Sequence, residues 1–142
     1  MILPDVNVLI YAHRRDAKEH PAYRDWLENI LNGDATYAVS DVVLSGFVRV
    51  ATHPKIMDPP STIDQALTFT ARLLDPPHRV MVRPGPRHWS IFARFCREIS
   101  ARGNLVPDAF LAALAIEAGC EIITCDRDFA RFTGLRWRHP LA

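Results

Sequence analysis

The opening stretch, Met1–His13, constrains the fold more than any other part of the chain. A short apolar run reaches Asp5, and a second apolar run, Val6–Ala12, follows at once. This order predicts a buried strand that ends near Asp5 and a helix that starts near Asn7, although the β-branched residues at every second position could also continue the strand. A carboxylate at the end of such a strand lies where open α/β sheets bind ligands. The alternative is that Asp5 only caps the helix.

Strand-like and helix-like segments alternate along the rest of the chain. Further strands are predicted at residues 36–39, 79–82, 121–124 and 135–137, and further helices at 22–31, 41–51, 63–74, 89–99 and 108–118. This alternation predicts an α/β fold, a three-layer sandwich in which a mainly parallel central sheet carries helices on both faces. The chain contains no repeat and no shift in composition, so residues 1–142 are expected to form a single domain.

The composition narrows the possible classes of protein. Hydrophobic residues make up 49% of the chain, which is typical of a globular protein, and the net charge of +1 excludes a uniformly basic nucleic-acid binder. All lysine and arginine positions except Lys18 and Lys55 are arginines, which favours a phosphate-bearing partner. The alternative is an arginine-rich, solvated surface that reflects the base composition of the genome. Three cysteines without a C-x-x-C pair predict a reduced, cytoplasmic protein, and no run is long enough to cross a membrane.

Three aspartates are expected to meet at one edge of the sheet. Asp5 follows the first predicted strand, Asp126 follows a late one, and Asp108 opens the helix that leads into that late strand. Parallel strands place their carboxyl ends together, and oxygen ligands gathered there suit Mg²⁺ or Mn²⁺. Taken singly, each residue has another explanation, because Asp108 suits a first helical turn, and Asp126 and Asp128 suit a tight turn.

Several motifs in this arrangement resemble those of a known family. Residues Asp5–Ala12 (DVNVLIYA) resemble the opening signature of PIN-domain nucleases, and Pro107–Ala115 and Thr124–Phe129 resemble their third and fourth acidic motifs. Within that family, the chain looks most like the VapC toxins of bacterial VapBC type II toxin–antitoxin pairs. The stretch Leu44–Pro54 resembles a subgroup that is well represented in mycobacteria.

The resemblance implies a Mg²⁺-dependent endoribonuclease, with Mn²⁺ as a substitute ion, that acts as a toxin by hydrolysing RNA phosphodiester bonds. Asp5, Asp108 and Asp126 would be both the catalytic residues and the metal ligands. The expected partners are RNA, a VapB-type antitoxin and a second copy of the chain in a homodimer. Two further roles follow: Asn7 and Thr124 would orient carboxylates or waters, and Arg14 and Arg15 would contact flanking RNA phosphates.

One position departs from the family pattern. The family usually carries a glutamate in the helix after the second strand, and the matching residue here is Gly46. Asp41, at the start of the same helix, and Asp128 are the nearest acids that could replace it. The alternative is that the missing carboxylate marks a weak or inactive PIN-like protein that holds RNA or a partner without cutting it.

Overall fold

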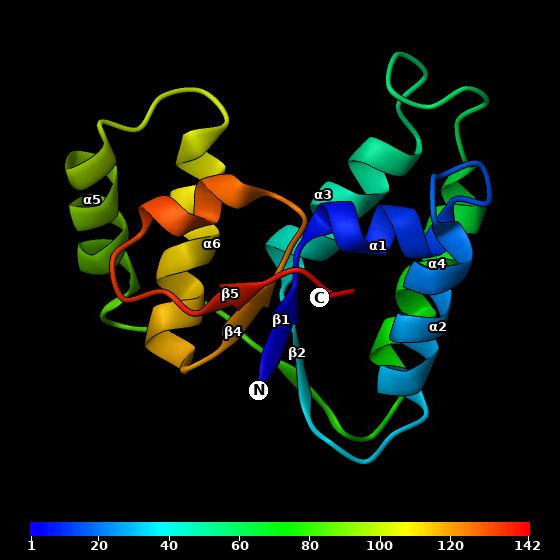
Figure 1. The fold of residues 1–142 in the computed structure, drawn as a ribbon, viewed down its shortest axis with the longest axis horizontal. Coiled ribbons are helices and arrows are strands. Elements are labelled where there is room, and N and C mark those ends of the chain that lie inside the picture. Colours follow the sequence, from blue (N-terminus) through cyan, green and yellow to red (C-terminus); the bar gives the residue numbers. More distant parts are fainter.

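A computed structural model describes residues 1–142, and its centre is a single sheet of five strands (Figure 1). Every pairing in the sheet is parallel, and the strand order is β3-β2-β1-β4-β5. The predicted α/β architecture with a parallel sheet is therefore confirmed. The strands are short: β1 Ile2–Pro4, β2 Tyr37–Val39, β3 Arg79–Met81, β4 Glu121–Ile123 and β5 Trp137–Arg138.

Six helices and one short 3₁₀ helix connect the strands. Local sequence explains several of their ends: Thr62 and Gln65 form a reciprocal capping box at the start of α4, and Gly119 ends α6 in the left-handed conformation, with φ of 72°. The helices are α1 Val6–His13, α2 His20–Leu31, α3 Asp41–Ala51, α4 Ile63–Leu74, α5 His88–Ile99 and α6 Leu105–Ala118, and the 3₁₀ helix η1 is Arg127–Arg131.

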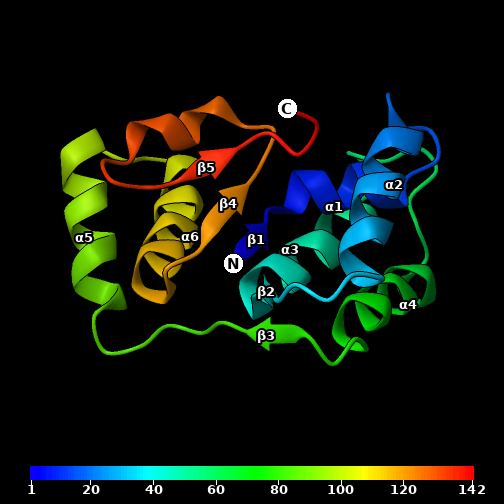
Figure 2. The ribbon, with the colours of Figure 1, turned by 60° about the horizontal axis from the view of Figure 1, so that its bottom comes forward.

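The helices cover the sheet from two sides. Helices α1 to α4 lie on one face, and α5 and α6 lie together on the other, as Figure 2 shows. The direction of the chain across the sheet explains this division. Connections from β1 to β2 and from β2 to β3 run one way, whereas the connection from β3 to β4 runs back. Because such crossovers are right-handed, the two directions place their helices on opposite faces.

The strand order reverses between β1 and β4, which are neighbours in the sheet. Their registers pair Ile2 with Glu121 and Pro4 with Ile123. The backbone N–H of Asp5 continues this pairing by donating to the carbonyl oxygen of Ile123 at 2.9 Å. Ligands of open α/β sheets bind beyond the carboxyl ends of strands at such a reversal. The fold thus presents the residues after β1 and after β4 as one candidate site.

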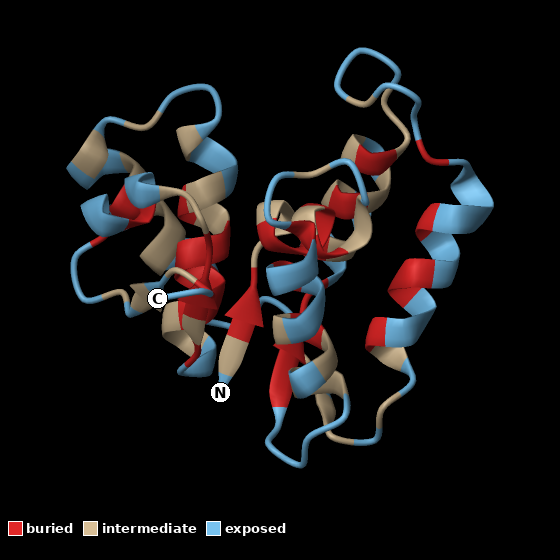
Figure 3. Ribbon diagram, turned by 45° about the vertical axis from the view of Figure 1, so that its right-hand side comes forward, coloured by how far each residue is buried: buried red, intermediate tan, exposed pale blue.

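The core lies where the helices meet the sheet. Leu3, Ile122 and Ile123 in the central strands are completely buried, and the helices expose their outer faces (Figure 3). On the α1–α4 side, Phe47 of α3 stacks on Phe69 of α4 with ring centroids 4.7 Å apart. None of the helices is both long enough and apolar enough to cross a membrane.

Several predicted boundaries were wrong by one to three residues, and two of these shifts have a clear local cause. Helix α6 begins at Leu105 and not at Asp108, because Pro107 falls in the first turn, where a missing N–H costs no intrahelical hydrogen bond. The last strand covers Trp137–Arg138 instead of residues 135–137, since Leu135 still belongs to the turn that follows η1. Neither shift changes the topology.

Candidate metal centre

Asp5 is held rigidly at the end of β1. Its Oδ1 accepts a hydrogen bond from the backbone N–H of Val6 at 2.8 Å, so Asp5 does cap α1. Its Oδ2 accepts from the Thr124 hydroxyl at 2.9 Å and from the Asn7 amide at 3.4 Å. Asp5 therefore has both predicted roles: it caps α1, and it lies at the carboxyl edge of the sheet.

Thr124 joins the two loops that follow β1 and β4. Its side chain is completely buried, and its hydroxyl donates to Asp5 while accepting from the Asp126 N–H at 3.0 Å and the Asn7 amide at 3.2 Å. A hydroxyl has one proton and two lone pairs, so this network uses its full capacity. Asn7 completes the connection by accepting from the Cys125 N–H at 3.3 Å. The predicted orienting residues thus contact the predicted acids directly.

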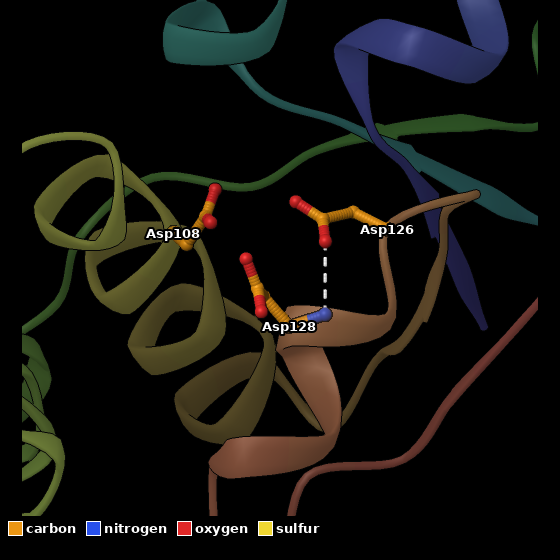
Figure 4. Close-up of side chains that lie close together, drawn as sticks. All are labelled: Asp108, Asp126 and Asp128. Atoms are coloured by element: carbon orange, nitrogen blue, oxygen red, sulfur yellow. Dashed lines mark hydrogen bonds between the residues drawn. The ribbon is translucent and has the colours of Figure 1, made fainter.

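Three further carboxylates converge in front of this network. Asp108 projects from α6, Asp126 lies in the turn after β4, and Asp128 lies at the start of η1 (Figure 4). Each offers one carboxylate oxygen within 4.8 Å of those of the other two. The turn is shaped by Asp126, whose Oδ1 accepts from the Asp128 N–H at 2.8 Å. Asp5 lies outside this closest group. Its charge nevertheless raises the pKa of Asp108, and the charge of Asp126 contributes to raising the pKa of Asp5.

Burial, with a contribution from the neighbouring negative charges, raises the pKa of two of these acids. Burial is the main cause for Asp108, and the charges of Asp126, Asp5 and Asp128 add to it, so that the pKa of Asp108 rises to about 7. Burial also raises the pKa of Asp5, although the hydrogen bonds from Thr124 and Val6 oppose the shift. Carboxylates this close repel one another unless protons or a cation neutralise them. A divalent cation is the natural counter-charge for such a set.

Asp5 and Asp108 also share a pocket of about 410 Å³ between α3 and α6. The wall formed by α3 includes Gly46 and Arg49, and the opposite wall begins at Asn104. The other lining residues are mainly aliphatic, with Ser45 as a further polar residue. The remaining lining residues are Val6, Val42, Val43, Pro107 and Leu111. The pocket gives a ligand access to Asp5 and Asp108, whereas Asp126 and Asp128 do not line it.

This arrangement corresponds to a known family. A family model described as the PIN domain matches residues 2–135 of the chain. The chain belongs to the PIN-domain family. It is 44% identical over 141 residues to the VapC ribonuclease Mb2897 of Mycobacterium bovis, which covers 99% of this chain and 96% of that protein. Ribonuclease VapC31 of Mycobacterium tuberculosis is 39% identical over 140 residues, with 99% of each chain covered. The predicted likeness to mycobacterial VapC proteins is confirmed.

Solved structures of PIN-domain proteins share the fold. A complex of VapBC2 from Rickettsia felis with a promoter DNA fragment contains a chain that superposes with a TM-score of 0.70 at 19% identity, over 98% of both chains. VapC20 of Mycobacterium tuberculosis, described as a toxin that cleaves the sarcin–ricin loop, gives a TM-score of 0.64 at 14% identity, over 92% of this chain and 93% of that one. At these identities the likeness concerns the fold.

Three predicted site residues of this PIN-domain chain, Asp41, Arg14 and Arg15, lie away from the acidic centre. Asp41 forms an exposed ion pair with Arg83, whose Nε lies 2.7 Å from Asp41 Oδ2, and it does not line the pocket. Arg14 is paired with Asp16 at 2.8 Å. Together with Arg15 it lines a second pocket, beside the end of α1, to which none of the gathered acids contributes. The structure therefore separates these three residues from the acidic centre.

Two features of the PIN-domain site went unnoticed in the sequence. The first is Arg49, which shares the pocket with Asp5 and Asp108 and lies three residues after Gly46 on α3. The spacing from Gly46 places both on one helix face and could have identified it. The second is the contact at Gly46, where an added Cβ would lie 3.0 Å from Cγ2 of Val6. A glycine inside a helix indicates a close approach, but no pattern in the sequence identifies Val6 of α1 as the neighbour.

Proposed function

We propose that the protein is a Mg²⁺-dependent endoribonuclease, the toxin of a toxin–antitoxin pair, which hydrolyses phosphodiester bonds of RNA. One observation carries the proposal. Carboxylates from both ends of the chain gather at the carboxyl edge of the sheet, where the strand order reverses, and their mutual repulsion helps to raise the pKa of Asp108 to about 7. The ribonuclease names of relatives that match almost the whole chain support the same activity.

The donor set fits a divalent cation, because all its groups are hard oxygen ligands and only one of them, the exposed Asp128, has an ion pair, with Arg131 at 3.4 Å. Asp5, Asp108 and Asp126 would hold the ion, with Asp128 as a further acid. When bound, Mg²⁺ or Mn²⁺ supplies Lewis-acid charge to a scissile phosphate and lowers the pKa of a water molecule.

The remaining residues of the site prepare these carboxylates. Thr124 and Asn7 fix Oδ2 of Asp5, so that this oxygen keeps one orientation before substrate arrives. Without a cation, the carboxyl group of Asp108 retains a proton over much of the range below pH 7, which relieves the repulsion from Asp126 and Asp128. The pocket beside Asp5 and Asp108 would admit the RNA backbone.

The proposal includes partners and a location. A VapB-type antitoxin would bind the protein and block its activity, two copies of the chain would form a homodimer, and both would act in the cytoplasm. Solved VapBC complexes that share the fold support the antitoxin. Exposed apolar side chains support association through helix faces, since Ile63 and Leu67 lie one turn apart on α4 and are each about half exposed, at 54% and 51%.

A cleavage assay tests the activity. The purified protein is incubated with labelled RNA in Mg²⁺, in Mn²⁺ and in EDTA, beside the variants Asp5→Asn and Asp126→Asn. We expect divalent-dependent cleavage that each variant lowers by at least about a hundredfold, because several kcal/mol of charge stabilisation is lost. Asp34→Asn, at an exposed position away from the pocket, is the matched control and should retain full activity.

The outcomes separate the two candidate functions. Cleavage that persists in Asp5→Asn and Asp126→Asn would point to a contaminating nuclease and contradict the assignment of the site. RNA binding by the wild type without any cleavage would favour a binding protein, a reading suggested by Gly46 in place of the family glutamate. Light scattering of the purified protein tests the homodimer, and a monomeric mass would contradict that part of the proposal.

A further inference from the structure

Arg49 is the only basic residue that lines the pocket shared by Asp5 and Asp108. It lies on α3, where its side chain is exposed, and Gly46 precedes it by one helical turn on the same face. A positive charge next to a group of acids would ordinarily be expected to pair with one of them. The structure shows a different arrangement.

The guanidinium of Arg49 forms no ion pair and no hydrogen bond within the protein. The charges that act on Asp108 are those of other aspartates, and no arginine contributes to lowering the pKa of Asp5 or Asp108. Seven of the fifteen arginines lie within 4.0 Å of a carboxylate, namely Arg14, Arg24, Arg72, Arg83, Arg94, Arg131 and Arg138. Arg49 is unpaired although it shares a pocket with two aspartates. Arg49 therefore keeps its full hydrogen-bonding capacity for a group from outside.

Gly46 contributes no side chain to the pocket, one helical turn before Arg49. A Cβ built on Gly46 would have one neighbour within 4 Å, the Cγ2 atom of Val6, and nothing else from the pocket. At this position α3 therefore adds no side chain to the pocket, although Val42, Val43 and Ser45 of the same helix do line it. Glycine in a helix costs roughly 1 kcal/mol relative to alanine, and it permits the close approach of another backbone or ligand.

We propose that Arg49 binds an RNA phosphate adjacent to the scissile bond, and that the backbone of the RNA passes over the gap at Gly46 to reach the acids. This inference rests on the proposed ribonuclease function and names a binding residue within it. The planar guanidinium matches two phosphate oxygens, which a lysine ammonium does not. The contact holds the backbone and carries no base specificity. It therefore affects RNA affinity and KM far more than kcat.

Binding is measured in a background that does not cleave. The variant Asp126→Asn, alone and combined with Arg49→Gln or Arg49→Lys, is titrated into a fluorescein-labelled single-stranded RNA in Mg²⁺ at several salt concentrations. We expect Arg49→Gln to raise the dissociation constant about tenfold at low salt. The slope of log K against log salt should fall by about 0.7, the value for one phosphate contact on a single strand. Arg49→Lys should retain the slope and bind with intermediate affinity.

The matched control is Arg97→Gln, which removes an exposed arginine of α5 that has no ion pair and lies outside the pocket. We expect its dissociation constant to stay within twofold of the background. Equal effects of Arg49→Gln and Arg97→Gln would overturn the proposal, because only general charge would then matter. Steady-state kinetics of the single variant Arg49→Gln provide the second readout, with KM raised and kcat nearly unchanged, and an unaltered KM would also overturn it.

The test distinguishes this inference from the function on which it rests. If the wild type cleaves RNA and Arg49→Gln leaves affinity, salt slope and KM unchanged, the phosphate contact is refuted and the nuclease stands. If the wild type neither binds nor cleaves RNA, the proposed function itself fails. Calorimetry with Mn²⁺ alone adds a check, since Arg49→Gln should not weaken metal binding, and a weaker affinity would assign Arg49 to the acids instead.

Discussion

The hydroxyl of Thr124 donates to Oδ2 of Asp5 at 2.9 Å, across 119 residues of sequence. This contact ties the loop after β1 to the loop after β4, so it also fixes the distance between the acids that each loop carries. The same hydroxyl accepts from the Asp126 N–H, which couples the position of the second acid to that of the first.

Replacement of Thr124 by valine should therefore damage stability and metal binding together. Thr124→Val keeps the shape but leaves the Asp126 N–H without its partner and Oδ2 of Asp5 with only the longer bond from Asn7, which costs about 1–3 kcal/mol of unfolding free energy. Urea denaturation measures the loss. Thr124→Ser retains the hydroxyl and is the control. Equal stability of the valine and serine variants would show that the hydrogen bonds contribute little.

The raised pKa of Asp108 predicts how the metal-free protein responds to pH. Between the ordinary aspartate value of 3.8 and about 7, the folded state binds more protons than the unfolded state at this group. This contribution to stability therefore falls as pH rises through that range. In EDTA, Asp108→Asn should raise the melting temperature at pH 8 by about 3 °C and change it little at pH 4. A gain that is the same at both pH values would contradict the shifted pKa.

The gap at Gly46 predicts an effect of added charge on metal affinity. Gly46→Glu places a carboxylate on the wall of the pocket that contains Asp5 and Asp108, and only Val6 must move by a few tenths of an ångström. We expect Mn²⁺ to bind about tenfold more tightly by calorimetry, since ligand charge raises affinity for a divalent cation. Gly46→Gln has the same size without the charge and should show no gain. A similar gain in both variants would point to helix stabilisation instead.

A buried hydrogen bond of Tyr37 predicts a change in stability away from the site. Its hydroxyl donates to the carbonyl oxygen of Leu73 at 2.6 Å, which joins β2 to the end of α4. Tyr37→Phe should lower the free energy of unfolding by about 1–3 kcal/mol, because the carbonyl loses its partner. Tyr11→Phe, in which the ring packs against Tyr23 without a hydrogen bond from its hydroxyl, is the control. Equal losses would contradict a specific role for the Tyr37 bond.

Much of the fold could be predicted because the strands and helices follow local patterns. The strand ending near Asp5 and the helices over Asp41–Ala51 and Ile63–Leu74 all have strong local signals, and the structure contains each of them. The parallel pairing of the strands could be predicted from the alternation of strands and helices along the chain. The start of α6 could not be read in this way, because proline is equally acceptable before a helix and in its first turn.

The sequence predicted the edge of the sheet at which the candidate site lies, but not the contacts between its side chains. That Asp5, Asp108 and Asp126 lie near one another follows from strand direction. The closer grouping of Asp128 with Asp126 depends on the turn into η1, and the pairing of Asp41 with Arg83 depends on contacts 42 residues apart. Distances of a few ångströms between such side chains arise from packing, which hydrophobic periodicity does not record.

The adjacency of β1 and β4 has a consequence for synthesis of the protein. Asp5 is synthesised early, but β4, the strand that lies beside β1, ends at Ile123. Asp126 and Asp128 are synthesised later still. A partly made chain therefore carries a lone aspartate without the Thr124 hydroxyl or the neighbouring acids. The proposed ribonuclease site would thus form only after Asp126 and Asp128 have been synthesised and β4 has paired with β1.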